Sequence, residues 1–110
     1  MVGELRTTMQ RPPEWLIKGA EGGDPTSMTN LGFMYESGRG VAHDDAEAVR
    51  WYRKAADAGY APAMRNLGMA YLNGLGVAKD GAEALGWYRK AAALGDEQSR
   101  RRSSASGNSV

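Results

Sequence analysis

The sequence predicts an all-α solenoid, a stack of helical repeats, and three observations lead to this prediction. Residues 25–60 align with residues 61–96 at a constant offset of 36, and 20 of the 36 aligned positions are identical. Each copy contains two stretches in which apolar residues recur at the spacing of one helix face. A pair of glycines separates the two stretches in both copies. A fixed period of about 20 to 50 residues indicates supersecondary units that stack to share one core.

Helix A, the first helix expected in each copy, has a clear start signal in the first copy. Asp24 stands where an N-cap residue is expected, and Pro25 follows at the first helical position, where its missing N–H costs nothing. Apolar or small residues then recur at i, i+3, i+4 and i+7, which puts them on one face. This face comprises Met28, Leu31, Gly32 and Tyr35 in the first copy and Met64, Leu67, Gly68 and Tyr71 in the second.

Helix B, the second helix of each copy, has its own start signal. Asp44 with Glu47, and Asp80 with Glu83, have the three-residue spacing of a capping box. We expect the glycine of helix A to lie beside the paired alanines of helix B, with the tryptophan filling the space alongside. The helix B face comprises Ala48, Trp51, Tyr52, Ala55 and Ala56 in the first copy and Ala84, Trp87, Tyr88, Ala91 and Ala92 in the second.

A Gly-x-Gly-Val segment joins helix A to helix B in both copies, at residues 38–41 and 74–77. Paired glycines permit positive φ after a helix end, so the segment predicts a tight turn. A phosphate-binding loop is the alternative, but no strand precedes the glycines. Asp44 and Asp80 also put carboxylates at the helix start where an anion would bind.

The repeat pattern extends upstream of the first whole copy but not downstream of the second. Trp15 lies 36 residues before Trp51, as Trp87 lies 36 after it, and this identical placement predicts packing rather than stacking on a ligand. Gly95 suits the C-cap of the last helix B, as Gly59 does in the first copy. The predicted organisation is an irregular segment at 1–12, a half repeat of helix B type at 13–24, whole repeats at 25–60 and 61–96, and a disordered polar tail at 97–110.

Composition excludes several classes of function. The chain has 110 residues, and its 14 basic and 13 acidic side chains create no field that would attract nucleic acid or an anionic membrane. It contains no cysteine, so neither disulfides nor thiolate chemistry are available. No signal-peptide pattern or membrane-length apolar run is present. We therefore expect a cytoplasmic protein with no nucleic-acid or membrane partner; a periplasmic location stays open should the chain be part of a longer protein.

The shared pattern N-L-G-x-x-Y-x-x-G-x-G-V-x-x-D-x-x-x-A-x-x-W-Y-x-K-A-A-x-x-G resembles the Sel-like repeat (SLR), a relative of the tetratricopeptide repeat (TPR). The resemblance covers residues 25–96 fully and 13–24 in part. It implies a right-handed α-solenoid of antiparallel helix pairs, with helix A lining a concave groove and helix B on the convex side. It also implies an adaptor role in protein complexes, common in bacteria. Cysteine-rich members of the family join each helix pair by a disulfide, which this chain cannot form.

Positions of helix A that differ between the copies are free of the packing constraint and predict a partner-binding face. An exposed Phe33 beside Met69 would form an apolar stripe that accepts an extended peptide or a helix. The alternative is that both side chains pack on the neighbouring helix A. Arg65 could add a charge-assisted contact to an acidic group of the ligand. The complete set of predicted partner-binding residues is Thr29, Asn30, Phe33, Arg65, Asn66, Met69 and Asn73.

Asn30 and Asn66 are polar and identical in both copies, immediately before Leu-Gly. In TPR relatives, the asparagine of this motif hydrogen-bonds the backbone or terminal carboxylate of a bound peptide, and the resemblance implies the same role here. An amide offers donors and an acceptor without the desolvation cost of a charge. The alternative is a bond to a carbonyl of a neighbouring loop.

The sequence predicts no catalytic residue, no metal site and no cofactor. The only histidine, His43, stands beside Asp44 and Asp45 at a helix start, where carboxylates cap the helix. No pairing of histidines, or of histidine with cysteine, provides metal ligands. The predicted function is therefore a non-catalytic protein-interaction module. A binder of cell-wall or β-lactam ligands, or an enzyme acting on them, is a further alternative that family analogy leaves open and no residue supports.

Self-association is the main alternative function. A solenoid repeat contacts only its neighbours, and its terminal repeats need polar caps. Because no helix A follows the last helix B, we expect Trp87, Tyr88 and Ala91 to be exposed there. The sequence thus predicts either a homo-oligomer formed end to end or a segment of a longer array.

Overall fold

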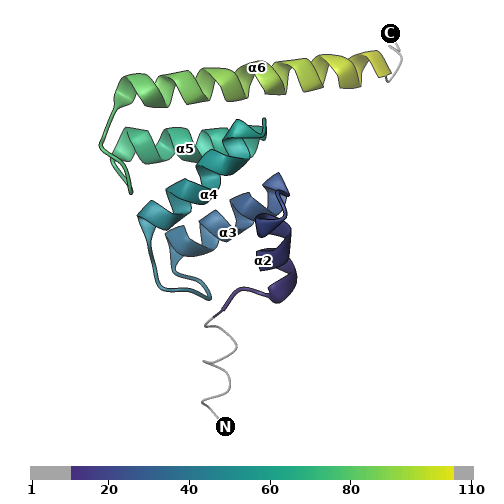
Figure 1. Cartoon of the computed structure of the whole chain (residues 1–110). Helices are drawn as coiled ribbons and strands as arrows, with labels where there is room; N and C mark the ends of the chain where they lie inside the picture. Colours follow the sequence, from purple (N-terminus) through teal and green to yellow (C-terminus); the bar gives the residue numbers. More distant parts are fainter. Residues whose placement is uncertain (1–10, 106–110) are drawn as a thin grey trace.

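The computed structural model describes the backbone of residues 11–105 and the side chains of residues 11–95. Within this range it contains five α-helices and no strand, so the prediction of an all-α fold is confirmed. The helices follow one another in a stack (Figure 1). They are α2 (Glu14–Glu21), α3 (Pro25–Ser37), α4 (Asp45–Asp57), α5 (Ala61–Asn73) and α6 (Gly81–Ala105).

Each helix packs mainly on the helices next to it in sequence, as expected for a solenoid. α3 pairs with α4, and α5 pairs with α6, while α4 packs on α5 and α2 packs on α3. α3 and α5 are therefore the A helices, and α4 and α6 are the B helices of the two repeats. α3 and α5 also touch each other directly.

The predicted helix starts are confirmed by side-chain caps. The Asp24 carboxylate accepts hydrogen bonds from the N–H and the hydroxyl of Ser27, at 3.1 and 2.7 Å. Asp44 accepts from the N–H of Glu47 and Asp80 from that of Glu83, both at 3.1 Å. Each cap occupies one of the free N–H groups of a helix start, which stabilises that end.

The turn between helix A and helix B adopts the predicted glycine conformation. α3 ends at Gly38 with a φ of 73° and α5 ends at Gly74 with a φ of 71°, both left-handed. The turn is then tied back to helix A, because the Asp44 N–H donates to the Tyr35 carbonyl at 2.9 Å. This bond takes the place of the second half of a capping box, since the Glu47 carboxylate instead lies 3.4 Å from Arg50 Nε.

The closest approach of the paired helices is at the glycine of helix A. A Cβ added to Gly32 would lie 2.7 Å from Cε1 of Tyr52 and 3.1 Å from the Ala48 carbonyl oxygen. A Cβ on Gly68 would lie 3.2 Å from the Tyr88 ring. The expectation that this glycine faces the paired alanines of helix B is therefore wrong. The glycine makes room for the tyrosine of the Trp-Tyr pair.

The three tryptophans do not share one environment. Trp51 is buried and Trp87 is half-buried, but Trp15 is 68% exposed, so the prediction that all three pack in the core is wrong for Trp15. Leu16 and Ala20, which follow Trp15 on α2, are buried. In the two whole repeats a helix A precedes each helix B, whereas no helix A precedes α2 among the described residues.

The last helix continues beyond its predicted end. α6 passes through Gly95, reaches Ala105 and extends past the end of α5 (Figure 1). The predicted C-cap at Gly95 is therefore wrong, and so is the disordered tail over residues 97–105; residues 106–110 lie outside the described residues. Gly59 differs because the chain must reverse there, with a φ of 90°, to bring α5 against α4. No described helix follows α6 that would require such a reversal.

The surface left uncovered by the end of the repeats also differs from the expected one. Ala91 is buried, and Trp87 and Tyr88 are half-buried, so the prediction that these three are exposed is wrong. α5 already covers that face of α6. Leu85 (48% exposed) and Ala92 are exposed instead, although their counterparts Val49 and Ala56 are buried in α4.

Replacing Gly32 by alanine tests the helix A to helix B contact. We expect Gly32→Ala to lower the free energy of unfolding by about 1–3 kcal/mol, because the new methyl group overlaps Tyr52 and a backbone carbonyl. Gly86→Ala is the matched control, since no atom lies near its added Cβ, and it should raise stability by about 0.5–1 kcal/mol. Urea unfolding followed by circular dichroism measures both. Equal effects of the two changes would contradict the close contact.

The Asp24 cap predicts a pH-dependent contribution to stability. The hydrogen bond from the Ser27 hydroxyl, and to a smaller extent that from the Ser27 N–H, hold the pKa of Asp24 below its ordinary value of 3.8. A carboxyl group whose pKa is lower in the folded state than in the unfolded state stabilises the fold at pH values above its unfolded-state pKa. This stabilisation is lost as the pH falls through the folded-state pKa. The stability difference between wild type and Asp24→Asn should therefore shrink below about pH 4. Urea unfolding at pH 7 and pH 3 checks this, and a difference that stays constant would refute it.

Candidate functional site

A cavity of about 210 Å³ lies between the two A helices, and we call it the inter-repeat cavity. Phe33 and Glu36 of α3 form one wall, and Asn66 and Met69 of α5 form the other. α4 contributes Asp45, Ala48, Val49 and Tyr52. The remaining lining residues are Ala70 of α5 and Leu75 of the following turn. The cavity is thus built where one repeat stacks on the next.

The inter-repeat cavity has apolar walls that are only partly covered. Phe33 is 48% exposed, Met69 is 46% exposed and Leu75 is 37% exposed. Phe33 and Met69 occupy equivalent positions of the two repeats, so the stacking of α3 and α5 brings them to the same opening. The alternative was that both side chains simply pack on the neighbouring helix A. Such packing covers only part of each side chain, because about half of it is exposed.

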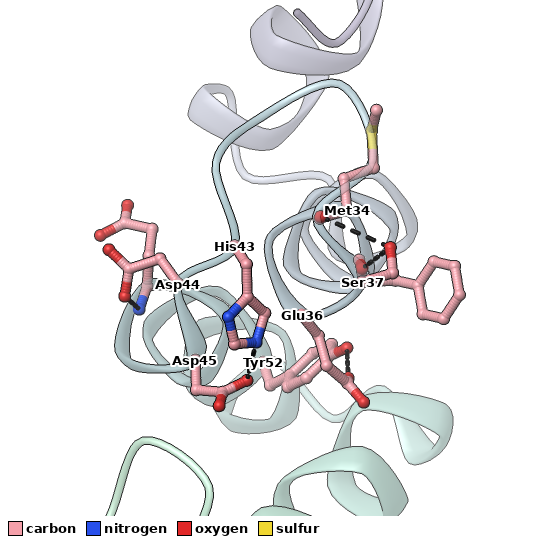
Figure 2. Close-up of polar contacts among 9 residues, drawn as sticks. Met34, Glu36, Ser37, His43, Asp44, Asp45 and Tyr52 are labelled. Carbon is pink, nitrogen blue, oxygen red and sulfur yellow. Dashed lines mark hydrogen bonds and ion pairs between the residues drawn. The ribbon is translucent and has the colours of Figure 1, made fainter. Parts of the chain in front are cut away.

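A buried tyrosine and two carboxylates supply the polar part of the inter-repeat cavity. The Tyr52 hydroxyl donates to Glu36 Oε1 at 2.5 Å, as Figure 2 shows. Burial raises the pKa of Tyr52 above its usual range, and the hydrogen bond to Glu36 raises it further. Asp45 lies nearby, with Oδ1 3.1 Å from Nε2 of the exposed His43 (Figure 2). The charged groups that line the cavity are therefore acidic.

The acidic residues of the cavity are absent from the second repeat. The counterparts of Glu36 and Asp45 are Leu72 and Gly81, so neither carboxylate is needed to build a repeat. Glu36 and Asp45 are not among the partner-binding residues predicted from the sequence. The sequence signal that could have identified them is that both differ between the copies. This difference does not reveal that α3 and α4 bring the two residues to one opening.

Three of the seven predicted partner-binding residues line the inter-repeat cavity: Phe33, Asn66 and Met69. Asn66 is half-buried, and its amide forms no hydrogen bond with another residue of the range 11–95, including the carbonyls of neighbouring loops. Asn30 and Arg65 are exposed but do not line the cavity.

The other two predicted residues are engaged within their own helices. Thr29 is buried, and its hydroxyl donates to the Pro25 carbonyl at 2.8 Å, so its inclusion in a partner-binding face is wrong. A threonine hydroxyl within a helix readily bonds the carbonyl four residues earlier, which is what removes it from the surface. Asn73 donates from Nδ2 to the Met69 carbonyl at 3.2 Å at the end of α5 and lies outside the cavity lining.

Among the described residues, no three His, Cys, Asp or Glu side chains come together in an arrangement that could hold a metal ion. None of the helices that the structure describes combines the length and the apolar character needed to cross a membrane.

Solved structures similar to this chain include three that each have a TM-score of 0.72. A protective antigen of uropathogenic Escherichia coli with an SLR fold is 44% identical over 74% of the chain. A Sel1 repeat protein from Oxalobacter formigenes is 45% identical over 73%, and the cysteine rich protein B of Helicobacter pylori is 30% identical over 74%. The match spans 17%, 61% and 62% of those three proteins, respectively.

No match was found among curated proteins. The sequence profile of the Sel1 repeat matches residues 25–60 and 61–96, the same two ranges that the 36-residue period defines. These two repeats include α3 to α5, most of α6 and the whole lining of the inter-repeat cavity. The chain belongs to the Sel1 repeat family.

Proposed function

We propose that this chain is a non-catalytic protein-interaction module that holds a segment of a partner protein in the inter-repeat cavity. Sel1 repeats are generally protein-interaction modules rather than enzymes. The observation that carries the proposal is the pair Phe33 and Met69, two half-exposed apolar side chains from successive repeats at one opening. Such a hollow can accept an apolar side chain, whose burial would remove it from water.

The polar groups of the inter-repeat cavity suggest how the segment would be oriented. The Asn66 amide can both donate to and accept from a main chain that passes the α5 wall. Glu36 and Asp45 would repel an acidic side chain, and Arg65, which could attract one, is not part of the lining. The preferred segment is therefore an apolar anchor residue with uncharged or basic neighbours.

Self-association is the second candidate, and a different surface favours it. Leu85 is 48% exposed on α6, although its counterpart Val49 is buried beneath α5. Stacking a second copy on this face of α6 would cover Leu85 and Ala92 as α5 covers Val49 and Ala56. The two candidates involve separate residues, so substitutions can distinguish them.

Surface substitutions in the inter-repeat cavity test the proposal. Peptides that bind wild type are first selected from a displayed random library, and their affinity is then measured by titration calorimetry. Phe33→Ser and Met69→Ser should each weaken binding at least about tenfold, which corresponds to a loss of about 1.4 kcal/mol in binding free energy. Leu85→Ser is the matched control, because this leucine is as exposed as Phe33 and lies outside the cavity. Equal loss in all three variants, or no loss in the cavity variants, would contradict the proposal.

The asparagines provide a second comparison in the same assay. Asn66→Ala should weaken binding by a factor of about 5 to 10, because a main-chain hydrogen bond is lost, whereas Asn30→Ala should not. Sedimentation of the unliganded protein tests self-association. A mass that rises with concentration in wild type and stays monomeric in Leu85→Ser would favour the α6 end as a homo-oligomer interface.

A further inference from the structure

A second cavity, of about 590 Å³, shares no lining residue with the inter-repeat cavity. It lies among α2, α3, the turn before α4, and α4, and we call it the α2–α4 cavity. Tyr35 and Trp51 supply aromatic surface, and Ile17 of α2 supplies aliphatic surface. None of the functions considered above uses this space.

The second repeat shows what fills the equivalent space. There, Arg53 of α4 lies over the ring of Tyr71, with its guanidinium carbon 5.7 Å from the ring centroid. One of its terminal nitrogens also donates to the Tyr71 hydroxyl. A guanidinium suits this position because it stacks on an aromatic face and donates hydrogen bonds in the same plane.

The first repeat lacks this guanidinium. At an offset of 36, the counterpart of Tyr71 is Tyr35, and the counterpart of Arg53 is Ile17. Isoleucine is shorter and cannot donate a hydrogen bond, so it neither reaches over the tyrosine nor satisfies its hydroxyl. The α2–α4 cavity stands at this position, with Ile17 and Tyr35 both in its lining.

Charge around the α2–α4 cavity favours a cation. Glu21, Asp44 and Glu47 contribute three carboxylates to the lining, whereas Arg11 contributes one cation. Glu47 is in part neutralised by Arg50 at 3.4 Å. The lining retains an excess of acidic groups, and these would attract and hold a positively charged side chain.

The aromatic partner for that cation is Tyr35. Trp51 already has the ammonium of Lys54 4.8 Å from its ring centroid, so a cation of this chain occupies one of its faces. Lys90 repeats this arrangement over Trp87 at 4.6 Å, which identifies it as part of the repeat. Tyr35 has no such cation among the residues that the structure describes.

We propose that the α2–α4 cavity binds an arginine side chain of a partner protein. Its guanidinium would lie over Tyr35 as that of Arg53 lies over Tyr71, with its charge facing Glu21, Asp44 and Glu47. An arginine is preferred to a lysine, because the compact ammonium group lacks the flat surface and the planar set of donors that this arrangement uses. This site goes beyond the proposed peptide cavity and lies on other residues.

The test uses blocked arginine, N-acetyl-arginine methylamide, titrated into the full chain labelled with ¹⁵N. Saturable shifts of the Tyr35 amide and the Trp51 indole N–H are expected, and blocked lysine should bind at least about fivefold more weakly. The decisive variant is Ile17→Arg, which supplies the guanidinium from the chain itself. It should weaken binding at least about tenfold. Ile17→Met keeps an apolar side chain of similar size and should bind as wild type does.

The reverse change tests the same idea in the second repeat. Arg53→Ile should open the equivalent space over Tyr71 and raise the number of bound arginines from one to two, with new shifts at Tyr71. Circular dichroism establishes that each variant keeps its helices; should Arg53→Ile not fold, Ile17→Arg alone decides. Absence of saturable binding to wild type, or equal affinity of wild type and Ile17→Arg, would overturn the proposal.

Discussion

The seating of the helix B tyrosine on the helix A glycine is the contact on which the rest of the structure depends. Because Gly32 has no side chain, the Tyr52 ring lies directly against the backbone of α3, and its hydroxyl reaches Glu36 one turn later. Tyr88 makes the corresponding contact at Gly68. This close pairing fixes how far each helix B stands from its helix A. Tyr52 therefore both packs the two helices of the repeat and lines the inter-repeat cavity.

Differences between the copies, placed on this common frame, identify the surfaces that packing leaves free. Glu36 and Asp45 are replaced by Leu72 and Gly81, and both acids line the inter-repeat cavity. Ile17 is replaced by Arg53, and the larger cavity lies beside the isoleucine. Residues identical in both copies account for the helix B caps at Asp44 and Asp80, the turn and the helix contact. A protein with an internal repeat thus supplies its own comparison, in which one copy shows what the other lacks.

The sequence was sufficient to predict the fold, the caps and the turn, because each depends on local chemistry. The turn and the helix B cap recur every 36 residues, whereas the Asp24 cap occurs once, because its counterpart Tyr60 forms no side-chain cap. Predictions from the sequence failed where a residue lacks the neighbouring helix that its counterpart in another repeat has. Trp15 is exposed although Trp51 is buried, and α6 continues through Gly95 although the chain turns at Gly59. For the site, the period places Phe33 and Met69 at equivalent positions, and both line the inter-repeat cavity. It could not predict that Thr29 bonds its own helix or that α4 adds Asp45, because these depend on rotamer and on the angle between helices.

On the two proposals, the cavities would let a solenoid change its partners without changing its core. The inter-repeat cavity requires two stacked A helices, whereas the α2–α4 cavity depends on the residue at one position of the preceding helix B. Arginine at that position, as in Arg53, places the guanidinium of the chain itself over the next tyrosine. Isoleucine, as in Ile17, leaves the space open. Neither residue belongs to the buried core, so this position can vary at little cost in stability. On the proposed arginine site, each unit of such a stack would be closed or open to a partner according to a single side chain.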